Sequence, residues 1–200
     1  MAEKKFWTIS KVLPWLIFVA GIIATIASIA LSVEVYQRLK NPSFVPVCNL
    51  NPVLSCTSVA DSHQSEAFGF PNYYLGIAGY AVIVTVGAVL LSGAKLGKKF
   101  WQLFMVGLGF AVAFIHWLIF ETLYRIGSLC IFCMVVWAVT MPIFWYSLIY
   151  NLQARNITPP KLLKKPLGFM TRYHLEFLLV WYLVIIGLIL KRFWYYWSGL

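Results

Sequence analysis

The chain has 200 residues, of which 62% are hydrophobic and 11% charged, and it contains nine Trp, eleven Tyr and fifteen Phe. This composition excludes an ordinary soluble protein and predicts an all-α integral membrane protein. Its length allows four or five spanning helices, which excludes a sizeable additional soluble domain. The net charge of +10 does not indicate nucleic acid as a partner, because the Lys and Arg residues lie in short segments between apolar runs.

Five apolar runs are long enough to cross a bilayer. The first, residues 12–33, would extend about 33 Å as a helix, and it is too long for the apolar core of a signal peptide. A mixed segment, residues 34–72, follows it as a long loop. The remaining predicted spans, in chain order, are residues 73–91, 100–120, 130–150 with Pro142 inside, and 175–193. We expect one membrane domain over residues 1–200.

The distribution of basic residues predicts how the chain is oriented. Five spans place the two termini on opposite sides, and Lys and Arg concentrate on the cytoplasmic side of membrane proteins. One side has five: Arg38, Lys40, Arg125, Lys191 and Arg192. The other has eleven: Lys4, Lys5, Lys11, Lys95, Lys98, Lys99, Arg155, Lys161, Lys164, Lys165 and Arg172. The N-terminus is therefore expected in the cytoplasm, with the long loop and the C-terminus on the outer side.

The four cysteines form two pairs that this orientation places on the outer side, where disulfides persist. Cys48 and Cys56 bound the loop segment "CNLNPVLSC", whereas Cys130 and Cys133 form "CIFC" at the start of the fourth span. Residues three apart share a helix face, and a helix N-terminus favours a thiolate. Cys130 is expected nearer the water and Cys133 about 5 Å deeper, so that one thiol faces a protein thiol and the other a membrane-dissolved partner.

This arrangement predicts a redox relay. A mobile loop pair beside a fixed helical pair suits dithiol–disulfide exchange, and a lipid-soluble quinone is the simplest electron acceptor because the sequence has no haem motif or flavin fingerprint. Two alternatives are weighed: a non-catalytic scaffold held by two structural disulfides, and a zinc site with four thiolate ligands. Such zinc sites usually have two short Cys-x2–4-Cys spacings, and only one is present, so no metal is expected.

The two cysteine motifs resemble those of the vitamin K epoxide reductase family. "CNLNPVLSC", with Ser55 before the second cysteine and Thr57 and Ser58 after it, looks like that family's loop pair, and "CIFC" looks like its active-site pair. The resemblance covers residues 12–150. It implies a four-helix bundle around a quinone site as the catalytic core, with residues 34–72 as the outer loop and residues 175–193 as an additional fifth transmembrane helix.

The resemblance also implies a role for each cysteine. Cys133 would be the quinone-proximal thiol, Cys130 would form a mixed disulfide with Cys56, and Cys48 would be the outermost shuttle. The quinone would be of the menaquinone, ubiquinone or vitamin K type, and the protein partner a DsbA-like thioredoxin-fold oxidase. Many bacterial members carry a fused thioredoxin-like domain after the fifth helix. Because this chain ends just after that helix, we expect a separate partner protein and a location in the bacterial cytoplasmic (inner) membrane.

Three further residues match family positions near the quinone. Asn72, in "PNYYLG", matches an asparagine whose amide donates to a quinone carbonyl, although a turn or helix N-cap is the alternative. Ser62 matches a hydroxyl near the site. Trp137 stands where animal members carry a tyrosine that donates a hydrogen bond to the quinone. The indole N–H of Trp137 is also a hydrogen-bond donor.

The remaining polar residues are expected to serve structure. His116, inside the third span, is expected to pack through hydrogen bonds, and Glu121 and Arg125, four apart, to form an ion pair. Three loop residues are expected to be solvated, with a position over the site as the alternative: Asp61, His63 and Glu66.

The sequence thus predicts a membrane thiol oxidoreductase that relays two electrons from a thioredoxin-fold partner to a quinone and drives disulfide formation. A vitamin K quinone or epoxide reductase with the same relay is the alternative within the enzyme class, and the disulfide-stapled scaffold is the alternative outside it. A DsbB-type enzyme would carry its Cys-x-x-Cys in the first outer loop, and here the order of the two pairs is reversed.

Overall fold

The structure, a computed structural model, describes residues 2–199, with side chains described from Ile9 onward. These residues form no β-strand, and five of their helices are long and apolar enough to cross a membrane: α1 (Ala2–Lys40), α3 (Asn72–Leu91), α4 (Lys98–Glu121), α5 (Ile131–Gln153) and α7 (His174–Arg192). The predicted all-α membrane fold is therefore confirmed. Residues 1 and 200, and the side chains of Lys4 and Lys5, lie outside the described part, and a single domain over residues 1–200 stays a prediction.

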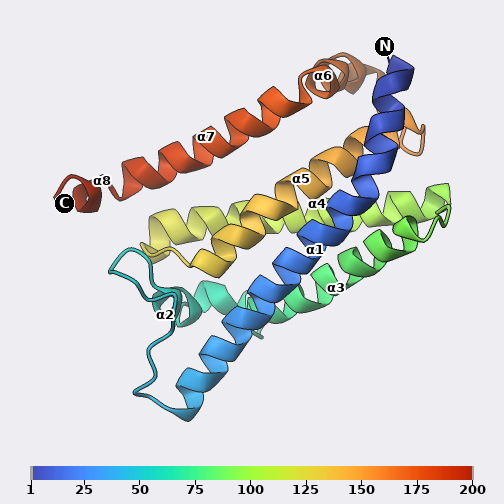
Figure 1. The fold of residues 1–200 in the computed structure, drawn as a ribbon. Helices are drawn as coiled ribbons and strands as arrows, with labels where there is room; N and C mark the ends of the chain where they lie inside the picture. The colour runs from blue at the N-terminus through green and yellow to red at the C-terminus, as the bar shows by residue number, and fades with distance from the viewer. Residues whose placement is uncertain (1, 200) are drawn as a thin grey trace.

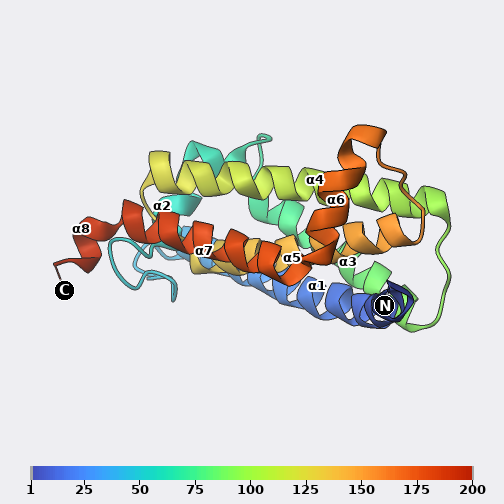
Figure 2. The same cartoon turned by 90° about the horizontal axis from the view of Figure 1, so that it is seen from above.

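Four of these helices form a bundle, and the fifth packs outside it (Figures 1 and 2). The core of the bundle combines Ile17 of α1, Ile83 of α3, Leu108 of α4 and Ile143 of α5 in one cluster of buried side chains. A separate cluster joins Leu178 of α7 to side chains of α5. This arrangement matches the predicted four-helix core with an additional helix.

The closest helix crossing lies between α1 and α3, where small residues allow backbone to approach backbone. A Cβ atom added at Gly87 of α3 would lie 2.6 Å from the backbone nitrogen of Phe18 in α1. At Gly76 an added Cβ would lie 2.5 Å from the hydroxyl oxygen of Ser28. Membrane helices gain dispersion contacts when small residues let them approach in this way.

Helix α1 continues beyond the predicted end at residue 33, and the extra turns hold the outer loop. The carboxylate of Glu34 accepts a hydrogen bond of 2.8 Å from the backbone N–H of Val47. Arg38 donates two hydrogen bonds to Asp61 and forms an ion pair with it. Asp61 was predicted to be solvated, and it is exposed although it is paired with Arg38. His63 and Glu66 are exposed, as expected.

Arg38 also changes the acidity of its partner. Its hydrogen bond lowers the pKa of Asp61, with burial opposing the shift. The pair therefore persists as the pH falls, until the carboxylate is protonated below its ordinary pKa. Because the Asp61 side chain is more than half exposed, this pair contributes little to stability and mainly orients the loop against α1.

Shorter helices complete the described part. The outer loop contains α2 (Cys56–Ala60) and the 3-10 turn η1 (His63–Glu66), and a π-helical turn, η2 (Thr122–Ile126), continues α4. A twelve-residue helix, α6 (Lys161–Arg172), connects α5 to α7, and α8 (Trp194–Trp197) follows α7. Helix α6 was not predicted, since its segment is too short and too charged to register as a span.

The polar residues within α4 behave as predicted. The His116 ring accepts a hydrogen bond of 2.9 Å from the Trp181 indole at Nε2, and its Nδ1 lies 2.7 Å from the carbonyl oxygen of Val112. Since an indole only donates, His116 carries its proton on Nδ1 and links α4 to α7. Glu121 and Arg125 form an ion pair of 3.5 Å.

Candidate functional site

A backbone bridge ties the two cysteine-bearing segments together. The N–H of Leu129 donates to the carbonyl of Val53 over 2.7 Å, and the N–H of Ser55 donates to the carbonyl of Leu129 over 2.9 Å. These bonds form an isolated parallel β-bridge between Leu54 and Leu129. Cys56 and Cys130 each follow directly after the bridged segments. The bridge therefore sets the loop pair against the start of α5, although the two segments lie far apart in sequence.

The end of α4 is shaped to make this bridge possible. The π-helical turn η2 ends at Gly127, whose φ of +71° is left-handed and suits glycine. Arg192, at the end of α7, donates a hydrogen bond of 2.6 Å to the carbonyl of Leu123 within this turn. The chain can thus reverse sharply between α4 and α5, and the segment before Cys130 is free to pair with the loop.

The outer loop is held in place by its own asparagines. Cys48 and Cys56 form a disulfide. The amide of Asn49 donates to the hydroxyl of Thr57 over 2.6 Å and accepts from its backbone N–H over 3.2 Å. The side-chain oxygen of Asn51 accepts from two backbone N–H groups, those of Val53 and Leu54. These bonds and the disulfide define the conformation of the loop, and its mobility during exchange stays a prediction.

The four sulfur atoms lie in one place, as the sequence predicted. Cys48, Cys56 and Cys130 are buried in a common cluster, and Cys133 packs against it. Cys130 and Cys133 are free thiols, so two of the sulfurs are thiols while the other two are bonded to each other. The bonded pair cannot serve as thiolate ligands in this state, which disfavours the four-cysteine zinc alternative.

The expectation that Cys130 lies nearer the water than Cys133 concerns depth in the bilayer, and it stays a prediction. Cys130 is 1% exposed because the loop disulfide and its neighbours cover it, whereas Cys133 is partly accessible. The accessible face of Cys133 lies on a cavity between the helices. Cys130 therefore packs against the loop pair, and Cys133 is the more accessible of the two thiols at the cavity wall; that each serves a different partner stays a prediction.

The position of Cys130 favours its thiolate. Cys130 is the N-cap residue of α5, and its carbonyl accepts the first hydrogen bond of that helix from Met134. A hydrogen bond with the Cys133 side chain lowers the pKa of Cys130, burial opposes this effect, and the backbone N–H groups of Phe132 and Cys133 reinforce it. A thiolate at this position is a good leaving group in disulfide exchange.

This acidity leads to a testable expectation. In a Cys48→Ala/Cys56→Ala protein, the thiolate of Cys130 should form at a lower pH than an ordinary cysteine thiolate and disappear as the pH falls through its pKa. Adding Cys133→Ala removes the first hydrogen bond and should move this titration to higher pH. Ultraviolet thiolate absorbance against pH measures both. An unchanged titration after Cys133→Ala would show that Cys133 does not stabilise the Cys130 thiolate.

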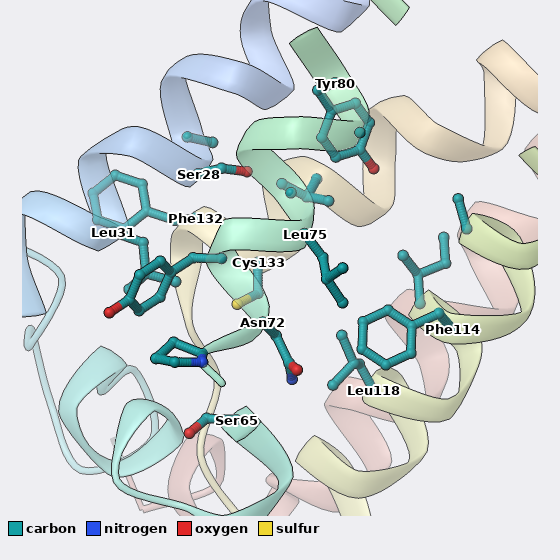
Figure 3. A pocket seen from close by; sticks show the side chains of 18 of the residues that line it. Ser28, Leu31, Ser65, Asn72, Leu75, Tyr80, Phe114, Leu118, Phe132 and Cys133 are labelled. Carbon is teal, nitrogen blue, oxygen red and sulfur yellow. The ribbon is translucent and has the colours of Figure 1, made fainter. Parts of the chain in front are cut away.

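The cavity that reaches Cys133 has the size of a small-molecule site. It measures about 690 Å³ and is lined by α1, α3, α4, α5 and the outer loop. Most of its lining is apolar, and its polar groups include Ser28, Asn72, Tyr80 and Cys133 (Figure 3). The outer loop and the end of α1 add charged groups, those of Arg38, Asp61 and Glu66. Figure 3 also shows the Cys133 sulfur and the Asn72 side chain facing the same space. The site can therefore hold a flat apolar molecule beside one reactive thiol.

The cavity is open on its lipid side. Val82 of α3 and Leu103 and Phe110 of α4 line it, and each is more than half exposed. An apolar ligand dissolved in the bilayer can therefore reach Cys133 without crossing water.

All three predicted ligand residues lie in the cavity wall. The Asn72 amide donates to the carbonyl of Gln64 over 2.6 Å, and its oxygen accepts from the N–H of Ala67 over 3.2 Å. Asn72 is the first residue of α3, and Pro71 before it is the N-cap, so Asn72 is not the capping residue. The Ser62 hydroxyl donates to a loop carbonyl over 2.7 Å, and Trp137 is 3% exposed. Their contacts with a ligand remain predictions.

Sequence reasoning missed a polar pair that joins Tyr80, in the same wall, to Thr140, which is fully buried. The hydroxyl of Tyr80 forms a hydrogen bond with that of Thr140, which donates in turn to the carbonyl of Val136 over 2.6 Å. Ser28 lies nearby on α1 and donates to the carbonyl of Ala24. Each residue stands alone within an apolar run, and isolated hydroxyls in membrane helices usually bond their own backbone. No local pattern distinguishes these three from such residues.

Comparison with known proteins identifies a family whose model covers the region that forms the site. A family model, the vitamin K epoxide reductase family, matches residues 15–148, which include all four cysteines and four of the five spans. A search of curated proteins returned no match. The matched region begins in α1 and ends in α5, so that it spans both cysteine pairs and the cavity between them. The chain belongs to the vitamin K epoxide reductase family.

Proposed function

We propose that the protein is a membrane thiol oxidase that carries two electrons from a separate thioredoxin-fold protein to a quinone and so drives disulfide formation. Family membership supports the general class, a membrane oxidoreductase that links disulfides to quinones. One observation carries the specific proposal: Cys130 is buried against the loop disulfide, whereas Cys133 is partly accessible at the wall of the cavity that both residues border. A relay needs two thiols that face two different partners in this way.

The proposed sequence of exchanges balances electrons at every step. A partner dithiol reduces the Cys48–Cys56 disulfide and becomes a disulfide itself. Cys56 then attacks Cys130 in an oxidised Cys130–Cys133 pair, forming a Cys56–Cys130 bond and releasing Cys133 as a thiolate. Cys48 attacks Cys56, which restores the loop disulfide and leaves Cys130 and Cys133 reduced. The oxidation states in the structure correspond to this last state.

The lining of the cavity fits a quinone ring. A bound quinone accepts two electrons and two protons from the Cys130–Cys133 dithiol, and Cys133 is the more accessible of the two thiols at the cavity wall. Asn72 uses one of its two N–H donors within the loop, so its second N–H suits a ring carbonyl. Trp137 and Ser62 would line the remaining wall. A menaquinone, a ubiquinone or a vitamin K type quinone satisfies this chemistry equally.

The proposed location is the bacterial cytoplasmic membrane, with the cysteines on its outer side. The loop cysteines lie at the opposite end of the bundle from the N-terminus and α6 (Figure 1). The eleven basic residues assigned to the cytoplasm belong to the N-terminal end, and an oxidising compartment suits the cysteine end. A scaffold with two structural disulfides is less well supported, because Cys130 and Cys133 are thiols.

The function is tested by reconstituting the protein in lipid with a quinone and a reduced thioredoxin-fold protein. Quinone absorbance should fall in proportion to the partner thiols oxidised. Cys48→Ala should reduce this rate by about a hundredfold or more with the protein reductant, and by much less with dithiothreitol, which can reduce the inner sulfurs directly. Ser58→Ala, an exposed change in the same loop, should leave both rates unchanged. Equal losses with both reductants would show that Cys48 is not the first acceptor.

A further inference from the structure

Helix α6 separates its residues into a basic face and an apolar face. At 100° per residue, the basic side chains fall within one sector: Lys161, Lys164, Lys165 and Arg172. The apolar side chains fall within the opposite sector: Leu162, Leu163, Pro166, Leu167, Phe169 and Met170. This pattern is that of an amphipathic helix, and it differs from the spanning helices, which are apolar on every side.

The protein itself leaves most of this apolar face uncovered. Leu162 is 87% exposed, Phe169 66% and Leu163 47%. Met170 is the α6 side chain that packs against a buried cluster, the one formed by α5 and α7. Three large apolar side chains would therefore meet water if α6 lay in solution, at a cost that a lipid surface removes.

The place of α6 in the fold puts it at a membrane boundary. Helix α6 follows the end of span α5 and precedes the start of span α7. Figure 2 shows it running across the direction of these spans, at the end of the bundle where the N-terminus lies. A helix held there lies in the plane of the headgroups, with its apolar side toward the acyl chains.

The charge on the other face identifies the lipid. Lys161, Lys164 and Lys165 are exposed, and among the described residues no carboxylate forms an ion pair with them. The nearest acidic residue along the chain is Glu176, in the first turn of α7. Such a cluster attracts the phosphates of anionic lipids, with an affinity gain of about fivefold for each lysine near the surface.

We propose that α6 is an interfacial helix that binds anionic phospholipid headgroups through Lys161, Lys164 and Lys165 and inserts Leu162 and Phe169 among the acyl chains. It thereby fixes the level of α5 and α7 in the bilayer. A soluble protein or a second copy of the chain would match the apolar face of α6 equally well. Neither explains why this apolar face lies beside a lysine cluster on a helix between two spans.

Hydrogen exchange of the intact protein in nanodiscs tests the proposal. With phosphatidylglycerol present, backbone amides of residues 163–171 should exchange at least fivefold more slowly than in pure phosphatidylcholine. Lys161→Gln/Lys164→Gln/Lys165→Gln should remove this difference between the lipids. Leu162→Ser/Phe169→Ser should speed exchange in both lipids, because insertion is weakened whatever the headgroup.

The matched control is Lys95→Gln/Lys98→Gln/Lys99→Gln, which removes three lysines from the connection between α3 and α4 and from the first turn of α4, and it should leave protection of α6 intact. Equal exchange in the two lipids would overturn the proposal. So would protection that disappears when each nanodisc holds a single chain, which would assign the apolar face to a second copy. Soluble phosphate added to phosphatidylcholine nanodiscs should give no protection, and protection by it would refute lipid binding.

Discussion

Replacing Cys133 with alanine is expected to stop quinone reduction, with a loss on the order of a thousandfold or more. Both thiols border the cavity, but Cys130 is 1% exposed and packs against the loop disulfide, whereas Cys133 is partly accessible. In the variant, the remaining Cys130 thiolate can attack Cys56 in the Cys48–Cys56 bond. This exchange forms a Cys56–Cys130 disulfide and frees the Cys48 thiol, so it needs no external oxidant.

The freed Cys48 thiol can reverse this exchange, so the Cys56–Cys130 disulfide should be present as an equilibrium fraction, and alkylation of the Cys48 thiol should trap it. Peptide mapping without reduction measures the Cys56–Cys130 adduct, and quinone absorbance measures turnover in the same sample. Met134→Ala changes the adjacent, partly buried residue of α5 and should retain most of the turnover. Normal turnover by Cys133→Ala, or an adduct joining Cys48 to Cys130, would contradict the proposed order of the thiols.

Gly87→Val is expected to destabilise the bundle by about 3 kcal/mol or more. Its first added carbon would lie 2.6 Å from the backbone nitrogen of Phe18 and 2.7 Å from its Cα. Backbone atoms cannot move aside as a flexible side chain can, so α1 and α3 must separate. Since both helices line the cavity, the variant should also lose quinone binding.

Gly109→Val supplies the matched control, because a Cβ atom at Gly109 of α4 meets no atom within 4 Å. Thermal unfolding in one detergent, followed by tryptophan fluorescence, should show a lower midpoint for Gly87→Val and nearly the original midpoint for Gly109→Val. Equal midpoints for the two variants would show that the close crossing of α1 and α3 contributes little to stability.

The spanning helices were predictable because their length and apolar composition are dictated by the bilayer. The prediction stopped α1 at residue 33, where the apolar run ends at Glu34, but helix-compatible residues continue to Lys40 before the "NP" at Asn41. A hydropathy pattern does not reveal a helix that continues through polar residues, whereas a proline does indicate where that helix ends. Helix α6 was not predicted for the same reason, since its amphipathic pattern has low average hydropathy.

The parts of the candidate site that follow from the spacing of residues in the sequence were predictable. Two cysteines three apart at the start of a helix must share a face, and the orientation of the spans brings both pairs to one end. The Leu54–Leu129 bridge joins segments 75 residues apart, and nothing local marks either partner. The pairing of Arg38 with Asp61 depends on the unpredicted end of α1. Contacts of this kind arise from tertiary packing and leave no local pattern.

The central claim is that the Cys130–Cys133 dithiol alone reduces a quinone in the cavity. The most direct measurement uses a Cys48→Ala/Cys56→Ala protein, reduced, freed of reductant, and mixed with a quinone in slight excess. The proposed function predicts one quinol formed per protein, with a Cys130–Cys133 disulfide appearing at the same rate. Quinone that stays oxidised while both thiols remain free, across menaquinone, ubiquinone and vitamin K types, would contradict it.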